Sequence, residues 1–205
     1  MLRSGTVVND ATADAGMVPT HRVDRQRLQQ TPAERLRELG RDIMSAAYLR
    51  GDFVLSSGAR SSYYFDKYLF ETRPSILRRV ATALADMISP DTDRIAGPEL
   101  GGVALATALS LETGLPFVIV KKEVKAYGTA RLVEGELHPG DRITVVEDVI
   151  TTGAQAIHAA RQVVNAGGKV LAVIGVIDRE QGGAEQIATA GFHFDALFRR
   201  ADLGS

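Results

Sequence analysis

The second half of the chain alternates short apolar runs with segments of helical length, and this alternation restricts the fold more than any other feature. β-Prone runs stand at 95–96, 117–120, 143–146, 170–177 and about 193–198. Segments of helical length lie between them at about 103–113, 153–166 and 184–190. Strands that alternate with helices form a mostly parallel, doubly wound α/β sheet with right-handed crossovers. In such sheets ligands bind beyond the carboxyl ends of the strands, so the residues that follow each run are the candidates for function.

The N-terminal region predicts a tail followed by an amphipathic helix. Residues 1–30 are polar and lack sustained periodicity, which is typical of a disordered tail. Order is expected to begin at a capping box, with Thr31 as the N-cap, Pro32 at the first helical position and Glu34 reaching back. The helix is expected to run as far as Gly51.

Three further segments complete the predicted organisation. The β-prone stretches 53–55 and 63–65 flank a segment rich in turn formers, which predicts a hairpin. Pro74 opens a second amphipathic helix. The polar segment 122–140 is long for a loop in a compact domain, and this length favours a lid or a disordered segment. We expect residues 31–205 to form a single domain.

Composition excludes several classes of protein. The 205 residues include 24 basic and 25 acidic side chains, for a net charge of −1, which does not favour bulk binding of nucleic acid. There is no cysteine for a disulfide or a thiolate zinc site. The four histidines, His21, His138, His158 and His193, show no paired ligand spacing. No apolar run is long enough to cross a bilayer or to form a signal peptide core, so a cytoplasmic protein that does not bind membranes is expected.

Two adjacent carboxylates, Glu147 and Asp148, follow the run 143–146, and no structural partner for Asp148 is evident from the sequence. A Walker B strand would need an upstream G-x-x-x-x-G-K-[ST] segment, which the chain lacks. In a phospho-receiver domain an acidic pair ends the first strand, whereas only 57 residues follow Asp148 here. Both of these explanations therefore fail.

A site for a phosphorylated sugar explains the acidic pair and the turn that follows it. Carboxylates accept hydrogen bonds from the vicinal hydroxyls of ribose. The backbone N–H groups of Thr151-Thr152-Gly153, at the start of a helix, can bind a phosphate. One phosphorylated pentose satisfies both parts.

The stretch 145–155, VVEDVITTGAQ, resembles the phosphoribosyl-diphosphate signature of the type I phosphoribosyltransferases. Three other segments narrow the resemblance to the orotate phosphoribosyltransferases. Residues 53–67 are similar to that family's N-terminal base-binding segment, residues 121–128 to its basic catalytic loop, and residues 178–183 to its Arg-x-x-Gly-Gly orotate loop. The resemblance covers about residues 34–200 in the family's order, and it implies a type I fold in which residues 31–70 contribute a small N-terminal hood.

The resemblance implies the transfer of a phosphoribosyl group from phosphoribosyl diphosphate to orotate, in the synthesis of pyrimidine nucleotides. It assigns catalysis to Lys125 and Asp148. It assigns binding of phosphoribosyl diphosphate to Lys121, Lys122, Lys125, Tyr127, Glu147, Asp148, Val149, Ile150, Thr151, Thr152, Gly153 and Ala154. It assigns binding of orotate to Tyr64, Phe65, Thr151 and Arg179. It also implies Mg²⁺ that bridges substrate oxygens, with no residue assigned directly to the metal, and a homodimer in which the basic loop acts in trans.

Two departures from the family pattern affect particular roles. Gly101 stands where some members carry a lysine, and Tyr127 stands where a histidine is common. Lys67 faces either the diphosphate or a solvated edge. Two other functions stay open: a phosphoribosyltransferase for another base, and a regulator that senses phosphoribosyl diphosphate without catalysis. The basic loop and the balanced charge favour an enzyme over the regulator.

Overall fold

The computed structural model describes residues 30–54, 58, 60–123 and 131–203. Its centre is a six-stranded sheet in the order β5-β4-β3-β6-β7-β8, parallel except for the edge strand β5. The strands are β3 (Arg94–Pro98), β4 (Phe117–Val120), β5 (Val133–Glu134), β6 (Arg142–Ile150), β7 (Lys169–Asp178) and β8 (Phe194–Arg199). The predicted doubly wound sheet is confirmed. The sequence analysis missed β5, which has only two residues.

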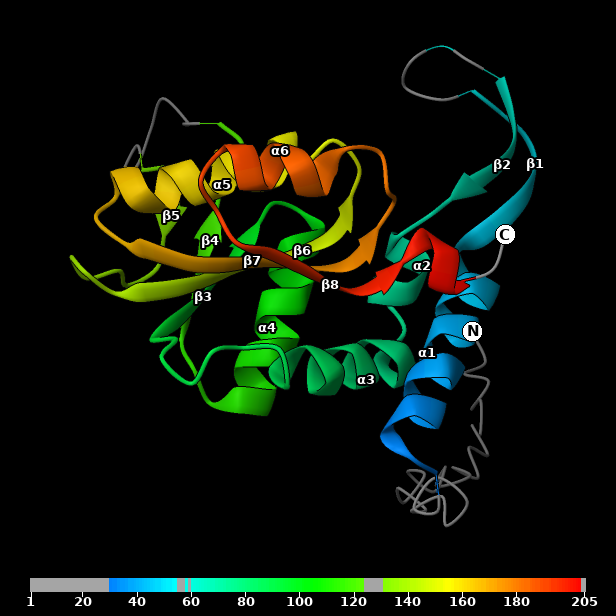
Figure 1. Ribbon diagram of the computed structural model, residues 1–205, viewed down its shortest axis with the longest axis horizontal. Helices are drawn as coiled ribbons and strands as arrows, with labels where there is room; N and C mark the ends of the chain where they lie inside the picture. The colour runs from blue at the N-terminus through cyan, green and yellow to red at the C-terminus, as the bar shows by residue number, and fades with distance from the viewer. Residues whose placement is uncertain (1–29, 55–57, 59, 124–130, 204–205) are drawn as a thin grey trace, which may run out of the picture.

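Helices cover both faces of the sheet (Figure 1). One face carries α3 (Pro74–Ala85) and α4 (Gly101–Thr113), and the other carries α5 (Ala154–Asn165) and α6 (Gly183–Thr189). Each face has its own buried cluster of aliphatic side chains, one built around Leu84, Leu105 and Leu109 and the other around Ala160 and Val163. Such two-sided burial explains why the strands are continuous apolar runs rather than alternating ones.

The N-terminal helix α1 (Pro32–Ala47) begins at the predicted capping box. Thr31 N donates to Glu34 Oε2 at 2.7 Å, and Glu34 N donates to Thr31 Oγ1 at 3.3 Å. The helix ends at Ala47 and not near Gly51, because Gly51 already lies in a strand that pairs with the second arm of the hairpin. The predicted disordered tail lies outside the described residues, except for residue 30.

The hairpin is confirmed and is longer than predicted. It consists of β1 (Tyr48–Val54) and β2 (Arg60–Phe65), which pair in antiparallel fashion apart from the central sheet. A four-residue helix, α2 (Tyr68–Glu71), links it to α3, and a short 3₁₀ helix (Arg200–Leu203) follows β8. No helix in the described ranges is long and apolar enough to cross a membrane.

The direction of strand addition reverses between β3 and β6. From β3 the chain passes outward to β4, and it then returns to place β6, β7 and β8 on the other side. The carboxyl ends of β3 and β6 consequently meet at a topological switch point, where doubly wound sheets bind their ligands. β6, which carries Glu147 and Asp148, ends here, and α5 begins just after it.

Candidate active site

Glu147 and Asp148 lie within β6 and not beyond its end. The expected strand 143–146 in fact continues to Ile150, because Glu147, Val149 and Ile150 all pair with residues of β7. The Glu147 side chain is only 4% exposed and that of Asp148 only 1%. The acidic pair is thus a buried part of the sheet and not a segment that follows it.

Asp148 has close partners from the N-terminal region, which corrects the expectation that it has none. Lys67 Nζ lies 2.6 Å from Asp148 Oδ2, and the Lys67 side chain is 30% exposed. The N–H group of Val149 donates to Asp148 Oδ1 at 2.5 Å. The carboxyl group of Glu71, on α2, also interacts with Asp148 and is only 3% exposed. Lys67 therefore faces the acidic pair.

Burial shifts the pKa values of the ionisable side chains in this cluster. Burial and the charge of Asp148 raise the pKa of Glu71 to about 8. Burial, with the Asp148 charge as the second cause, raises the pKa of Glu147 well above its ordinary value. For Lys67, burial lowers the pKa, but the charge and hydrogen bond of Asp148 outweigh it and leave the pKa raised. The raised pKa values of Glu71 and Glu147 favour the protonated form of these two carboxyl groups, and the raised pKa of Lys67 favours its ammonium form.

The turn between β6 and α5 is largely exposed to solvent. Thr151, Thr152 and Ala154 are exposed, and Gly153 is the N-cap of α5 with φ 75°. This left-handed conformation favours glycine, and a Cβ at Gly153 would in addition lie 2.9 Å from the Gly183 carbonyl oxygen. Within the part of the chain that the structure describes, no side chain caps the start of α5. A helix start of this kind can bind an anion through its first N–H groups, and the predicted phosphate site here stays a prediction.

The turn between β3 and α4 lies against the start of α5. Gln155 Nε2 donates to the Glu99 carbonyl oxygen at 3.1 Å, and Lys122 N donates to Glu99 Oε2 at 3.2 Å. A Cβ at Gly101 would lie 1.7 Å from Asp148 Oδ2. A lysine, or any side chain, therefore cannot occupy position 101 while Asp148 keeps this place.

A cavity of about 100 Å³ lies under the hairpin at the ends of β7 and β8, lined by Met44, Tyr48, Tyr63, Phe65, Ile177, Arg179, Arg200 and Leu203. Of the residues expected at the base, it brings together Phe65 and Arg179. Tyr64 alternates to the opposite face of β2, where it is 43% exposed and its ring packs against Phe53. The sequence analysis missed Tyr63 and Arg200. The period of two along β2 pairs Tyr63 with Phe65 and could have identified the first of them.

The basic residues after β4 have different surroundings. Lys121 Nζ pairs with Glu134 Oε1 on β5 at 2.7 Å, and the Lys121 side chain is 13% exposed. Lys122 is exposed. Lys125 and Tyr127 lie outside the described residues. The structure therefore places Lys121 and Lys122 at the strand end but does not test the rest of the predicted basic loop.

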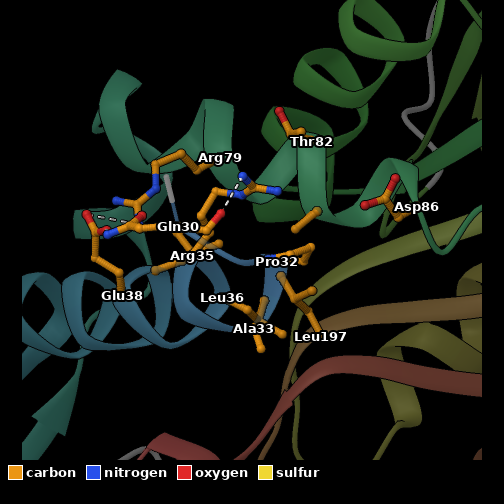
Figure 2. A pocket seen from close by; sticks show the side chains of 12 residues that line it. Gln30, Pro32, Ala33, Arg35, Leu36, Glu38, Arg79, Thr82, Asp86 and Leu197 are labelled. Atoms are coloured by element: carbon orange, nitrogen blue, oxygen red, sulfur yellow. Dashed lines mark hydrogen bonds and ion pairs between the residues drawn. The ribbon is translucent and has the colours of Figure 1, made fainter. Parts of the chain in front are cut away.

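A larger hollow, of about 440 Å³, lies between α1 and α3 and has no residue in common with the acidic cluster (Figure 2). Apolar side chains of α1 and Leu197 line its inner part, with Arg79 and Asp86 from the α3 region at its edge. The size of a cavity therefore does not identify the active site in this protein. The position of the candidate residues at the ends of the parallel strands does. Among the described residues, no group of three or more His, Cys, Asp or Glu side chains could hold a metal ion.

The protein is a type I phosphoribosyltransferase, a class defined by this doubly wound sheet with an acidic pair and a phosphate-binding turn at its switch point. Solved structures of the same class superpose on the chain. An orotate phosphoribosyltransferase of Mycobacterium tuberculosis in complex with Fe(III) dicitrate superposes with a TM-score of 0.76 at 32% identity, covering 83% of this chain and 99% of that one. The complex of the M. tuberculosis enzyme with 5-phospho-α-D-ribosyl 1-diphosphate gives 0.73 at 30% identity, with the same coverage.

Sequence comparison identifies the family. The orotate phosphoribosyltransferase of Halobacterium salinarum is 48% identical over 153 residues, which are 75% of this chain and 87% of that protein. A scan against models of protein families returned no match. The chain belongs to the orotate phosphoribosyltransferases, enzymes that transfer a phosphoribosyl group to orotate in pyrimidine biosynthesis.

Proposed function

We propose that this chain joins orotate to phosphoribosyl diphosphate at the switch point of its sheet, giving orotidine 5′-phosphate and diphosphate. One observation carries the proposal: the backbone N–H group of Arg179 donates to the Ile150 carbonyl oxygen at 2.8 Å. This bond joins the loop that carries the candidate base-binding arginine to the start of the phosphate-binding turn. A base and a sugar phosphate held by the two loops would lie next to each other.

Orotate is a planar pyrimidine that bears a carboxylate, and the cavity under the hairpin suits both features. The guanidinium of Arg179 can hold a carboxylate or carbonyl by two parallel hydrogen bonds. Phe65 offers a ring to the face of the pyrimidine. We retain Tyr64 and Thr151 as candidate contacts, although Tyr64 would have to reach the base from the outer face of β2.

The sugar phosphate would occupy β6 and the turn beyond it. The 5′-phosphate binds the N–H groups of residues 151–154 at the start of α5, and Glu147 and Asp148 take the ribose hydroxyls. Both carboxyl groups are covered, so the sugar gains access only when the Lys67 side chain moves away from Asp148. The diphosphate competes for this ammonium, and Lys121, Lys122, Lys125 and Tyr127 add further contacts to the anion.

In the reaction the pyrimidine nitrogen forms a bond to the sugar carbon while the bond to the diphosphate oxygen breaks, and the leaving group takes the electron pair. The sugar becomes cationic in the transition state, and the Asp148 carboxylate stabilises it from below. Lys125 supplies positive charge to the leaving oxygens and helps to exclude water. Orotate attacks as a conjugated anion, so no described side chain has to act as a strong base.

Magnesium would enter as part of the substrate, bound to oxygens of the diphosphate and ribose. When bound, the ion neutralises part of the charge of the leaving group. The carboxyl oxygens of Glu147 and Asp148 remain for the sugar.

Three further parts of the proposal concern context. Residues 31–70 form a hood over the base within a single domain of residues 31–205. The enzyme is a cytoplasmic homodimer that binds neither nucleic acid nor membranes, in keeping with its near-zero net charge. In the dimer, the loop that carries Lys125 serves the site of the neighbouring subunit.

An assay of product formation tests the chemistry. Purified protein, Mg²⁺, phosphoribosyl diphosphate and orotate should give a fall in ultraviolet absorbance that depends on every component, with pyrophosphate as co-product. Adenine, guanine and uracil in place of orotate separate this function from that of a phosphoribosyltransferase for another base. Turnover with one of these bases and none with orotate would overturn the base assignment. Tight, salt-dependent binding of nucleic acid without any turnover would favour the regulator instead.

Subunit mixing tests the action of Lys125 in trans. Lys125→Ala and Asp148→Asn should each be inactive alone. If the chains re-assort at random, about half of the dimers are mixed, and each has one site with an intact loop and an intact acidic pair, so about a quarter of native activity returns. A mixture that stays inactive after verified subunit exchange contradicts action in trans and leaves the orotate assay untouched.

A further inference from the structure

Glu71 lies against the acidic pair, although nothing in its local sequence marks it as part of the site. It is the last residue of α2, a helix of four residues, and its side chain is 3% exposed. Glu71 and Asp148 are 77 positions apart in the sequence, and they meet because α2 packs onto α4 at the switch point. Its Oε1 atom has no hydrogen-bond partner among the described residues, and a buried, unpartnered carboxyl oxygen of Glu71 needs an explanation.

The two carboxyl groups occupy a space that only glycine at position 101 leaves open. A Cβ there would lie 1.7 Å from Asp148 Oδ2 and 2.7 Å from Glu71 Oε1. The two oxygens therefore approach the same point beside the first turn of α4. Lys67 approaches Asp148 at 2.6 Å and completes the surroundings of that carboxylate.

Two buried carboxyl groups that converge on one point repel each other when both are ionised, and a proton on one of them removes this repulsion. If Glu71 were ionised, its Oε1 would have no hydrogen-bond partner among the described residues. It would face the negative charges of Asp148 and Asp66, which the Lys67 charge offsets only in part. Protonated, Glu71 donates to the Asp148 carboxylate. Burial and the charge of Asp148 raise the pKa of Glu71 to about 8, which keeps the proton in place at neutral pH.

We propose that Glu71 is a positioning residue, which holds the Asp148 carboxylate by a donated hydrogen bond in the place where it meets the ribose hydroxyls. The Val149 N–H group and the Lys67 ammonium also hold the Asp148 carboxylate. When the diphosphate draws Lys67 away, the hydrogen bond from Glu71 is the side-chain restraint that remains on Asp148 among the described residues. The proposal rests on the proposed role of Asp148 and adds to it the group that orients this side chain.

Two substitutions of similar size separate hydrogen bonding from packing. Glu71→Gln keeps an N–H donor, whereas Glu71→Met fills the same volume without one. The proposal expects Glu71→Gln to stay within about threefold of native kcat/KM for phosphoribosyl diphosphate, and Glu71→Met to lose about 10- to 100-fold, the effect of one hydrogen bond to a charged group. The KM for orotate should change in neither. Glu112→Ala, which removes an exposed carboxylate on α4, is the control and should match the native enzyme.

Equal activity of the Gln and Met variants would overturn the proposal, since packing alone would then suffice. If Glu71→Met does not fold, the dependence of kcat/KM on pH in Glu71→Gln tests the proposal instead. The native enzyme should lose activity as Glu71 gives up its proton above about pH 8, and the Gln variant should lack this alkaline limb. An unchanged limb contradicts the proposal. Calorimetric binding of phosphoribosyl diphosphate needs no orotate, so a failure here is distinguishable from a wrong base assignment.

Discussion

Gly101→Ala tests the geometry of the acidic cluster with the smallest possible change. The new Cβ would lie 1.7 Å from Asp148 Oδ2, whereas ordinary contacts begin at 3.4 Å, so this oxygen must move by about 1.7 Å. Glu71 Oε1, at 2.7 Å, blocks one direction of escape. The backbone of Asp148 is held in β6, so the carboxylate has to rotate and leave Lys67.

Stability and activity should respond differently to this change. Overpacking a buried site costs about 1–3 kcal/mol. Alanine recovers up to about 1 kcal/mol of helix stability relative to glycine. The free energy of unfolding should therefore fall only modestly. A displaced Asp148 loses a charge-assisted hydrogen bond to the sugar, of about 1.5–3 kcal/mol, so kcat/KM for phosphoribosyl diphosphate should fall about 10- to 100-fold.

Steady-state kinetics and thermal melting of the same preparations measure both effects. Thr107→Ala, on the exposed side of α4, is the control and should leave both unchanged. Gly102→Ala is the contrast, because its Cβ would lie 2.8 Å from the Val146 carbonyl oxygen, which cannot rotate away. Gly102→Ala should therefore lower the free energy of unfolding more than Gly101→Ala does. A folded Gly101→Ala enzyme with native kcat/KM would refute the reasoning, since Asp148 would then not need its observed place.

Three other outcomes follow from the site. Asp148→Asn should reduce turnover much more than melting temperature, and a large loss of stability with normal turnover of the folded fraction would contradict its role. Arg179→Ala should weaken orotate by about 2–4 kcal/mol and phosphoribosyl diphosphate little, as kinetics with each substrate varied will show. Because the pKa of Glu71 rises from 4.5 to about 8 on folding, its stabilising contribution is complete below about pH 4.5 and is lost as pH rises to 8. Melting curves from pH 5 to 9 should show that Glu71→Gln gains on the native protein as pH rises, by at most about 1.4 kcal/mol per pH unit, and parallel curves would contradict this.

The sheet could be predicted from sequence because its pattern is local. The five apolar runs from residue 95 onward and the glycines between them signal strands and turns within a few residues. The extent of β6 was missed, although Val149 and Ile150 are β-branched and continue the run. Glu147 and Asp148 interrupt the apolar pattern, and charged residues rarely occupy a buried strand, so the pattern predicts that the strand ends before them.

The motif residues of the site could be predicted, but their surroundings could not. Glu147, Asp148 and the turn to Gly153 are contiguous, so local chemistry identifies them. Lys67 and Glu71 reach Asp148 only through tertiary packing, and no local pattern of the chain encodes that approach. A helix of four residues such as α2 has too little periodicity to be detected.

Side-chain direction in the hairpin was the other uncertain point. Tyr63, Tyr64 and Phe65 are equally β-prone, and period-two alternation divides them between two faces. Which face turns inward depends on how the hairpin meets α1 and the end of β7, and this is a tertiary property. The cavity beneath the hairpin contains Tyr63 and Phe65. Tyr64 therefore remains a prediction that only an orotate complex can test.

The acidic cluster is costly to the fold, and this cost is itself an argument for function. Burying Glu71, Glu147 and Asp148 together requires two raised pKa values and one partly buried lysine. An apolar core at the same place would be more stable, because buried charges repay their desolvation poorly. Gly101, at the first turn of α4, gives up helix stability to leave room for two of these carboxyl groups. Stability alone would select against every one of these features, whereas a sugar that becomes cationic in the transition state requires a fixed negative charge beneath it.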